Sequence, residues 1–268
     1  WSGTQYDLPA ADDPQPRIPA QGWITGEVAR ALFAKAGLDL DQAYKDASRP
    51  GFKPVPMNAR LSLNLKSSTA QKSSRNVIGV LPGSEAPDET VVYMAHWDHL
   101  GKHEGADPSE NGGDNIYNGA VDNATGVAGI IEIAEKFATT EPKPKRSLVF
   151  LAVTLEESGL LGSKYYVAQP SIDLARTVGV INLDAMSVAG PSRDFVVTGL
   201  GNSEMEDILK TFADAQNRTL VEESNPAGGF YFRSDHFNFV KAGVPALYAK
   251  GGNDLVDGGA AAGQAAID

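Results

Sequence analysis

The 268-residue sequence contains no cysteine. That absence excludes structural disulfides, zinc sites built from thiolates and a cysteine nucleophile. No apolar run approaches the roughly 20 residues that a membrane-spanning helix requires, so we predict no transmembrane segment. The G-x-S-x-G elbow of many serine hydrolases does not occur either, which disfavours that class of enzyme.

Basic charge is also scarce. Lysine and arginine number 23 against 34 acidic residues, which gives a formal net charge of −11. Nucleic acids attract basic surfaces, so we predict no nucleic-acid partner. Hydrophobic residues at 42% and charged residues at 21% are typical of a soluble globular protein. The sequence opens on WSGTQYDLPA with neither an initiator methionine nor a signal peptide, so we expect a processed piece of a longer protein.

Residues 1–56 differ in character from the rest of the chain. They contain a proline-rich stretch, one helical pattern that we expect to begin at Thr25 and stop at Gly37, and a proline-rich linker. From residue 57 the pattern becomes that of a folded domain. Residues 59–68, ARLSLNLKSS, alternate with period two and predict a half-exposed antiparallel strand.

Apolar strands then alternate with amphipathic helices as far as the alanine-rich end of the chain. The predicted strands are RNVIGVLPG, ETVVYMAHW, RSLVFLAVTLEE, TVGVINLDAM, RDFVVTG and VPALYAKGG, and the segments between them include four helical patterns. Such alternation predicts an α/β fold with a mixed, mainly parallel central sheet and antiparallel additions at its edge.

Acidic residues gather where the predicted strands end. A surface excess of acid would not select these positions, which border the core, whereas ligands of open α/β sheets bind beyond the carboxyl ends of the strands. The residues at or next to these ends are His96, Asp98, Asp122, Glu156, Glu157 and Asp184.

Carboxylates crowded together repel one another and protonate unless a cation lies between them. A histidine with several carboxylates is a ligand set for zinc or a similar divalent ion. Several acids with few histidines further suggest two ions that share a bridging carboxylate. These observations predict a metal centre at the end of the sheet.

Five segments, in order, resemble the conserved blocks of the co-catalytic di-zinc aminopeptidases. They are AHWDHLG, GAVDNATG, EESGLLGS, INLDAMS and YFRSDHFNFVKAGVPAL. The same superfamily includes glutamate carboxypeptidase II and the glutaminyl cyclases. The resemblance implies a zinc-exopeptidase-like three-layer sandwich, with the sheet flanked by helices, and two zinc ions in each active site of the full-length protein.

The resemblance also implies roles for the acids at the strand ends. His96 and Asp184 would hold one zinc ion, Asp122 would bridge the two ions, and Glu157 would bind the second. Glu156 would be the general base that deprotonates the attacking water.

Three further residues receive roles from the same resemblance. Asp98 would orient the metal site, Tyr231 would stabilise the oxyanion, and Asp235 lies in the SDH block near the substrate. No role is assigned to His99 and His103, which we expect in a solvated loop.

The chain departs from the family pattern at its carboxyl end. The second zinc of the family takes a further histidine from a late segment that this sequence does not contain, and His236 could replace it only if its helix pointed towards the ions. We therefore expect residues 57–268 to be a catalytic domain without its carboxyl-terminal end. Residues 1–56 resemble the remnant of a protease-associated domain with its linker.

The implied function is hydrolysis of amino-terminal residues from peptides, so the expected partner is a peptide with a free amino terminus. The family also implies an extracytoplasmic location, either periplasmic or secreted. Three alternatives stay open: a glutaminyl-cyclase-like acyltransferase, a carboxypeptidase on acidic dipeptides, and a non-catalytic binding module like the transferrin receptor ectodomain.

Overall fold

The computed structural model describes residues 4–13, 15, 16, 18, 20–103 and 113–267. The chain forms two compact units, one built mainly from residues 15–72 and the other from residues 73–268 together with residues 5–14. The predicted division at residue 57 stays a prediction. None of the described helices has the length and apolarity needed to cross a membrane.

The first unit contains two short helices, α1 (Gly26–Lys35) and α2 (Leu40–Ala47). Helix α1 begins after Thr25, whose hydroxyl accepts a hydrogen bond from the Val28 amide at 3.3 Å, and it ends just before Gly37, as predicted. Neither helix buries a residue. This unit therefore has no hydrophobic core of its own among its described helices.

The prediction of a strand at residues 59–68 is wrong. This segment forms no strand, and the side chains of Leu61, Leu63 and Leu65 are 57–77% exposed. Alternating polarity favours a strand only where a neighbouring strand supplies hydrogen-bond partners and a face to cover. The described structure provides neither to this segment.

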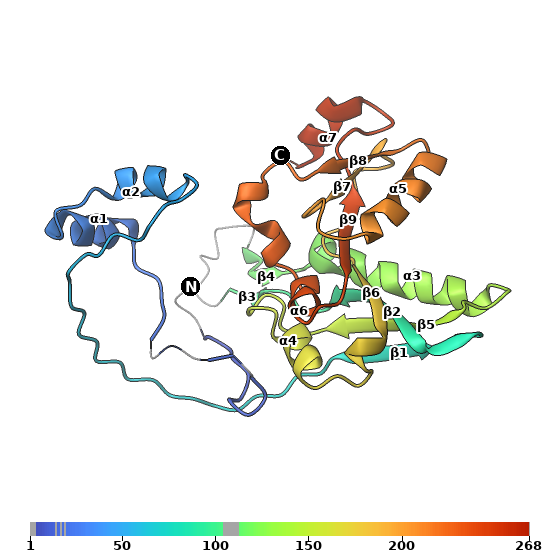
Figure 1. The fold of residues 1–268 in the computed structure, drawn as a ribbon, viewed down its shortest axis with the longest axis horizontal. Helices are drawn as coiled ribbons and strands as arrows, with labels where there is room; N and C mark the ends of the chain where they lie inside the picture. Colours follow the sequence, from blue (N-terminus) through green and yellow to red (C-terminus); the bar gives the residue numbers. More distant parts are fainter. Residues whose placement is uncertain (1–3, 14, 17, 19, 104–112, 268) are drawn as a thin grey trace. The chain divides into compact units, whose positions relative to one another are not determined.

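The second unit is built on a seven-stranded sheet with the order β1-β5-β2-β6-β9-β7-β8 (Figure 1). Two pairs are antiparallel, β1 with β5 and β7 with β9, and the others are parallel. The predicted mixed, mainly parallel sheet is thus confirmed, although β8 was not predicted. The strands are β1 (Val77–Leu81), β2 (Ala86–His96), β5 (Arg146–Val153), β6 (Thr177–Asn182), β7 (Asp194–Val197), β8 (Thr219–Glu222) and β9 (Ala246–Gly251). Strands β3 (Gly101–Lys102) and β4 (Ile116–Tyr117) pair with each other in a separate antiparallel sheet.

Helices cover both faces of this sheet (Figure 1). On one face, Ile130 of α3 packs with Ala95 and Leu183. On the other, Tyr166 of α4 and Phe239 of α6 join the larger core cluster. The helices of this unit are α3 (Thr125–Thr139), α4 (Leu161–Ala168), α5 (Met205–Ala215), α6 (His236–Lys241) and α7 (Gly259–Ile267), with short helical turns at Ala120–Ala124, Leu174–Arg176, Pro226–Gly228 and Phe230–Phe232.

The strand register brings the carboxyl ends of three neighbouring strands together at one end of the sheet. Strand β2 lies between β5 and β6, and all three are parallel. His96 pairs with Val153, and Met94 pairs with Asn182. The residues that follow Val153 and Asn182 therefore emerge beside His96, as expected for ligand-binding loops of an open α/β sheet.

Candidate metal centre

His96 ends strand β2 with its side chain only 1% exposed. Its Nδ1 lies 3.0 Å from the backbone oxygen of Asp98, and a proton there makes Nδ1 the donor. Its Nε2 lies 3.0 Å from Asp122 Oδ1 and 3.3 Å from Asp184 Oδ1. A hydrogen bond from one ring nitrogen fixes the tautomer and directs the other nitrogen towards a ligand. The Nε2 lone pair then faces two carboxylates, an arrangement that favours a cation between them.

Asp184 is held in place by its second oxygen. The Ser234 hydroxyl donates to Asp184 Oδ2 at 2.6 Å, and the Asn182 amide donates to that hydroxyl at 2.7 Å. All of these groups are buried. The network leaves Asp184 Oδ1 directed at His96.

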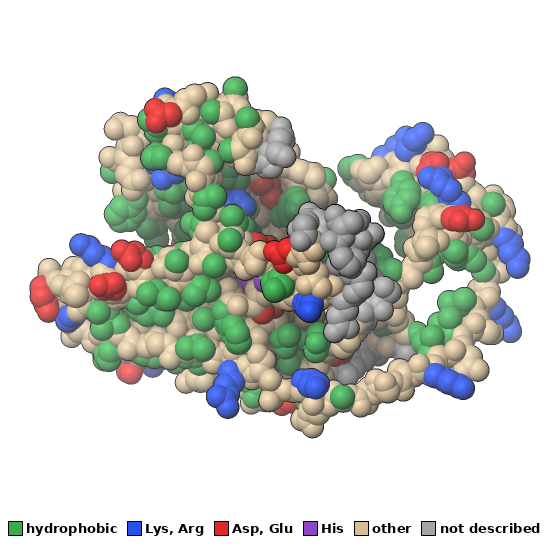
Figure 2. All heavy atoms as spheres, turned by 180° about the vertical axis from the view of Figure 1, so that it is seen from behind, with side chains coloured by type: hydrophobic (Ala, Val, Ile, Leu, Met, Phe, Trp, Pro, Cys, Tyr) green, Lys and Arg blue, Asp and Glu red, His purple; other side chains and the backbone are tan. Residues whose placement is uncertain are grey.

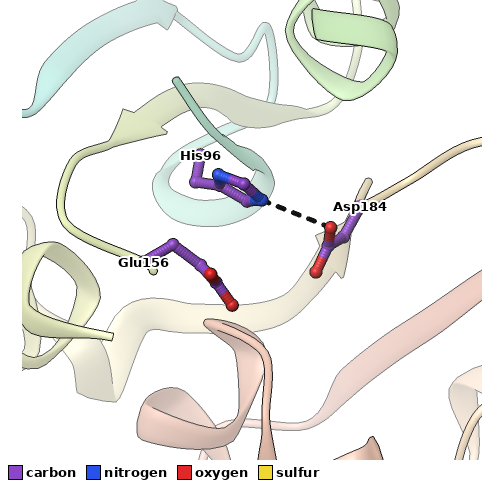
Figure 3. Close-up of side chains that lie close together, drawn as sticks. All are labelled: His96, Glu156 and Asp184. Carbon is purple, nitrogen blue, oxygen red and sulfur yellow. Dashed lines mark hydrogen bonds and ion pairs between the residues drawn. The ribbon is translucent and has the colours of Figure 1, made fainter. Parts of the chain in front are cut away.

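Glu156, together with His96 and Asp184, completes the first donor group, a set of side chains whose nitrogen and oxygen atoms could bind one metal ion. The backbone turns at Leu155, whose φ is +57°, and the Glu156 amide donates to Asp98 Oδ1 at 3.1 Å. Figure 3 shows the side chains of His96, Glu156 and Asp184 directed into one space. One ligand atom from each of the three lies within 4.8 Å of the others.

A second group of donors adjoins the first. It consists of His99, Asp122 and Glu157, whose ligand atoms also lie within 4.8 Å of one another. His99 Nδ1 is 2.6 Å from Glu157 Oε1, and both side chains are about one-fifth exposed. Asp122 Oδ1 also contacts His96, so Asp122 lies between the two groups.

The position of Asp122 is fixed by its neighbour Asn123. The Asn123 amide donates to the Leu183 carbonyl at 2.9 Å, and its oxygen accepts hydrogen bonds from the Gly126 and Ala185 amides. This buried side chain joins the start of α3 to the loop after β6. It therefore sets the separation of Asp122 from Asp184.

The electrostatics of the site favour a bound cation. Burial lowers the pKa of His96, but the hydrogen bonds to Asp122 and Asp184 outweigh burial and raise the pKa to about 11. Burial raises the pKa of Glu156 to about 9, and the charge of Asp235 adds to the effect. Burial also acts to raise the pKa of Asp184, yet hydrogen bonds from His96 and Ser234 lower it overall. A divalent ion would replace the proton on His96 and favour the charged form of Glu156.

Asp235 and Tyr231 lie in the polypeptide that leads into α6. Asp235 is fully buried and accepts a hydrogen bond from the Ser163 hydroxyl, which in turn accepts one from the Asn238 amide. Burial raises the pKa of Asp235 to about 7, against the effect of the Ser163 hydrogen bond. The Tyr231 ring lies edge-on to His236 with a centroid separation of 5.0 Å. Neither Asp235 nor Tyr231 belongs to a donor group.

His236 belongs to neither donor group among the described residues. Its ring is fully buried between Tyr231 and Tyr248, and neither of its nitrogens has a hydrogen-bond partner there. Burial lowers the pKa of His236 to about 4.

The sequence did not indicate that three further residues lie close to the centre. His99 was expected in a solvated loop but contacts Glu157, whereas His103 is exposed as expected. Ser234 supports Asp184, and Tyr248 lies among the charges of Asp184 and other site acids. The spacing of AHWDHLG could have suggested His99, but no local signal marks the other two.

The second donor group reaches the surface, because the Asp122 side chain is about half exposed and those of His99 and Glu157 are about one-fifth exposed. Figure 2 shows histidine as a small recessed patch close to acidic side chains. Imidazole nitrogens and carboxylate oxygens in this number are the donors that zinc prefers in cysteine-free sites. The residues present therefore fit a zinc site.

Comparison with known proteins points to the same chemistry. The family model described as Peptidase family M28 matches residues 76–263. Aminopeptidase NAALADL1 of Mus musculus is 31% identical over 169 residues, which cover 60% of this chain and 20% of the mouse protein. A probable zinc metalloprotease of Pyricularia oryzae is 31% identical over 196 residues, which cover 71% of this chain and 34% of the fungal protein.

A glutamate carboxypeptidase 2 homolog of Caenorhabditis elegans is 33% identical over 132 residues, 47% of this chain and 15% of that protein. Among solved structures, an aminopeptidase from Aneurinibacillus sp. strain AM-1 is similar with a TM-score of 0.50 and 25% identity. The similarity covers 66% of this chain and 39% of that one. The chain thus spans about a third or less of the length of these curated relatives.

Proposed function

The chain belongs to peptidase family M28, and from that membership we propose that it is a zinc-dependent exopeptidase that removes amino-terminal residues from peptides. The observation that carries this proposal is the convergence of His96 Nε2 with oxygens of Asp122 and Asp184, next to Glu156. The printed names of the relatives, an aminopeptidase and a zinc metalloprotease, support both the reaction and the metal.

The two donor groups give each residue a proposed place. His96 and Asp184 would hold one zinc ion, Glu157 would hold the other, and Asp122 would be shared between them. Bound zinc would polarise the scissile carbonyl and make a water molecule acidic enough to ionise near neutral pH. Asp98 holds the site together through its contacts with His96 and with the amide of Glu156.

The proton transfers fall to Glu156. Its carboxylate accepts a proton from the attacking water and then gives that proton to the leaving amine, as a general base and acid. Tyr231 donates a hydrogen bond to the oxyanion, which is a contribution of the kind that typically lowers a barrier by several kcal/mol. Asp235 supports the substrate end of the site from its buried position beside α6.

The test is the Glu156→Gln substitution in the zinc-loaded protein. Because the amide keeps the size of the side chain but cannot accept the proton, we expect kcat for a leucine p-nitroanilide to fall by at least about 1000-fold. The zinc content should stay that of the parent protein. Glu157→Gln is the matched comparison, and it should lose zinc as well as activity. An E156Q variant with parental turnover would disprove the base assignment.

A carboxypeptidase that acts on acidic dipeptides is the second candidate, and Lys250 favours it. Asn182, the last residue of β6, pairs with Tyr248, so Lys250 lies two residues beyond that pair on β9, and Asp184 lies two residues beyond it in the loop after β6. Lys250 is near enough for its charge to act on Asp184, and it forms no ion pair with another described residue. A lysine at this edge could bind a substrate carboxylate.

Substrate comparison separates the two candidates. The aminopeptidase proposal predicts rapid hydrolysis of leucine p-nitroanilide and little hydrolysis of an N-acetylated dipeptide that ends in glutamate. The carboxypeptidase alternative predicts the reverse preference, with a loss of at least tenfold in the Lys250→Met variant. In both cases, the reaction should stop when zinc is chelated.

The remaining alternatives receive less support. A glutaminyl-cyclase-like acyltransferase would need one zinc ion, whereas Asp122 lies between two donor groups. A binding module would have no use for the buried set around His96. We retain as proposals the division of the chain into a protease-associated remnant at residues 1–56 and a catalytic domain at residues 57–268, and an extracytoplasmic location.

A further inference from the structure

We propose that His99 is a protein ligand of the second zinc ion in this chain, together with Asp122 and Glu157. The inference rests on the proposed function, because it concerns the same di-metal site. It assigns a role to a side chain whose sequence context predicted a solvated loop.

The side chain of His99 points towards the carboxylates of Asp122 and Glu157. Its Nδ1 lies 2.6 Å from Glu157 Oε1, and one ligand atom from each of His99, Asp122 and Glu157 lies within 4.8 Å of the other two. Atoms at the corners of a zinc coordination sphere, each about 2.0–2.2 Å from the ion, lie within this separation. A cation among them would replace the hydrogen bond between His99 and Glu157.

The surroundings hold His99 in this position. Gly119 has a φ of +65°, and a Cβ there would lie 3.0 Å from His99 Cβ, so the backbone passes against the imidazole at a place that favours glycine. The ring of Tyr117 lies edge-on to His99 with a centroid separation of 6.3 Å. A solvated histidine would have no need of this packing.

The donor chemistry also calls for a nitrogen ligand. Within the part of the chain that the structure describes, the second group without His99 would offer only the carboxylates of Asp122 and Glu157, and Asp122 also contacts His96. Zinc sites that lack thiolates usually combine histidine with carboxylate. The other histidines do not supply this nitrogen, because His96 belongs to the first group, His103 is exposed and His236 is in neither group.

The experiment is zinc titration of the metal-free chain, with metal content measured after gel filtration. We expect two zinc ions per parent chain and one per His99→Ala chain, with second-site affinity reduced by at least 100-fold. His103→Ala is the matched control, since it removes an exposed histidine of the same segment and should leave two ions bound. A His99→Ala chain that still binds two ions at parental affinity would overturn the proposal.

Nitrogen-15 NMR of the four histidines in the parent chain tests the same claim without a substitution. The first equivalent of zinc should shift the His96 resonances and the second should shift Nδ1 of His99. An unchanged His99 resonance at two equivalents would overturn the proposal. Failure of the proposed function looks different, because a chain that binds two ions through His99 but cleaves no peptide would contradict hydrolysis alone.

Discussion

His236 is a buried residue whose ionisation is linked to folding. Its ring is completely buried, and neither ring nitrogen has a hydrogen-bond partner among the described residues. Burial therefore lowers the pKa of His236 to about 4. The unfolded chain, with an ordinary histidine pKa near 6.5, binds more protons between those two values. The stability linked to His236 is complete above the unfolded pKa and is lost as the pH falls towards 4.

We predict that His236→Phe weakens this pH dependence. Phenylalanine keeps an aromatic ring between Tyr231 and Tyr248 but cannot be protonated. Urea unfolding of the metal-free chain at pH 7 and pH 4.5 should show that the parent loses roughly 2–3 kcal/mol more than the variant. His103→Phe, at an exposed position, should lose as much as the parent. Equal losses in the parent and His236→Phe would contradict the account.

At the residue scale, the sequence singled out side chains that the structure brings together, but it did not reveal the contacts that support them. His96, Glu156 and Asp184 stand out because each follows an apolar strand, a signal that is local. The hydrogen bond from Ser234 to Asp184 joins residues 50 positions apart. Such a contact depends on how α6 packs against the sheet, and no spacing in the chain reveals it.

Among the elements, helix α3 packs closely against the loop that carries Asp184. Gly126 lies in its first turn, and a Cβ there would overlap the Leu183 carbonyl oxygen and the Asn123 side chain. These are the atoms that tie the start of α3 to the loop carrying Asp184. The helix can approach this loop because residue 126 has no side chain.

We predict that Gly126→Ala displaces the start of α3 and weakens zinc binding. Overpacking of this kind typically costs about 1–3 kcal/mol of folding free energy, and zinc affinity should fall because Asp122 moves with Asn123. Gly129→Ala is the control on the same helix, where a new methyl group would meet only the flexible end of Leu183. Calorimetric titration with zinc should show a large loss for the first variant and little change for the second. Equal affinities would contradict the positioning role of α3.

Element prediction succeeded where the pattern reflects burial and failed where it depends on a partner. The strands β2, β5 and β6 are apolar because helices cover both faces of the sheet. A continuous run of apolar residues is therefore enough to identify each of them as a buried strand. Residues 59–68 alternate as an exposed strand would, but they meet no neighbouring strand in the described structure. Strand β8 is short and half exposed, so its four residues carry little signal.

For the whole molecule, the family model and the structural units agree about the catalytic region. The match begins at residue 76 and the second unit at residue 73. Both starts lie after the alternating segment that the sequence assigned to the catalytic domain. A composition shift marks residue 57, whereas the first strand of the sheet, β1, begins at Val77. The division at residue 57 stays a prediction.

At the scale of the whole molecule, the proposed metal centre should link the stability of the folded chain to zinc. A ligand that binds the folded state alone stabilises it in proportion to the logarithm of its concentration above Kd. Zinc at 100 times its Kd should therefore add about 2.7 kcal/mol to the free energy of unfolding. We expect excess chelator to lower the midpoint temperature of thermal unfolding of the parent chain, and added zinc to restore it. A midpoint temperature that changes with neither treatment would argue against a structural contribution from the metal centre.

Anomalous diffraction at the zinc absorption edge, from crystals grown with excess zinc, tests the central claim most directly. The account predicts two peaks roughly 3.5–4 Å apart. One should lie within about 2.0–2.2 Å of His96 Nε2 and an Asp184 oxygen, and the other should contact Glu157, with Asp122 between them. An absence of zinc at these residues, or zinc bound at an unrelated place on the surface, would contradict the account.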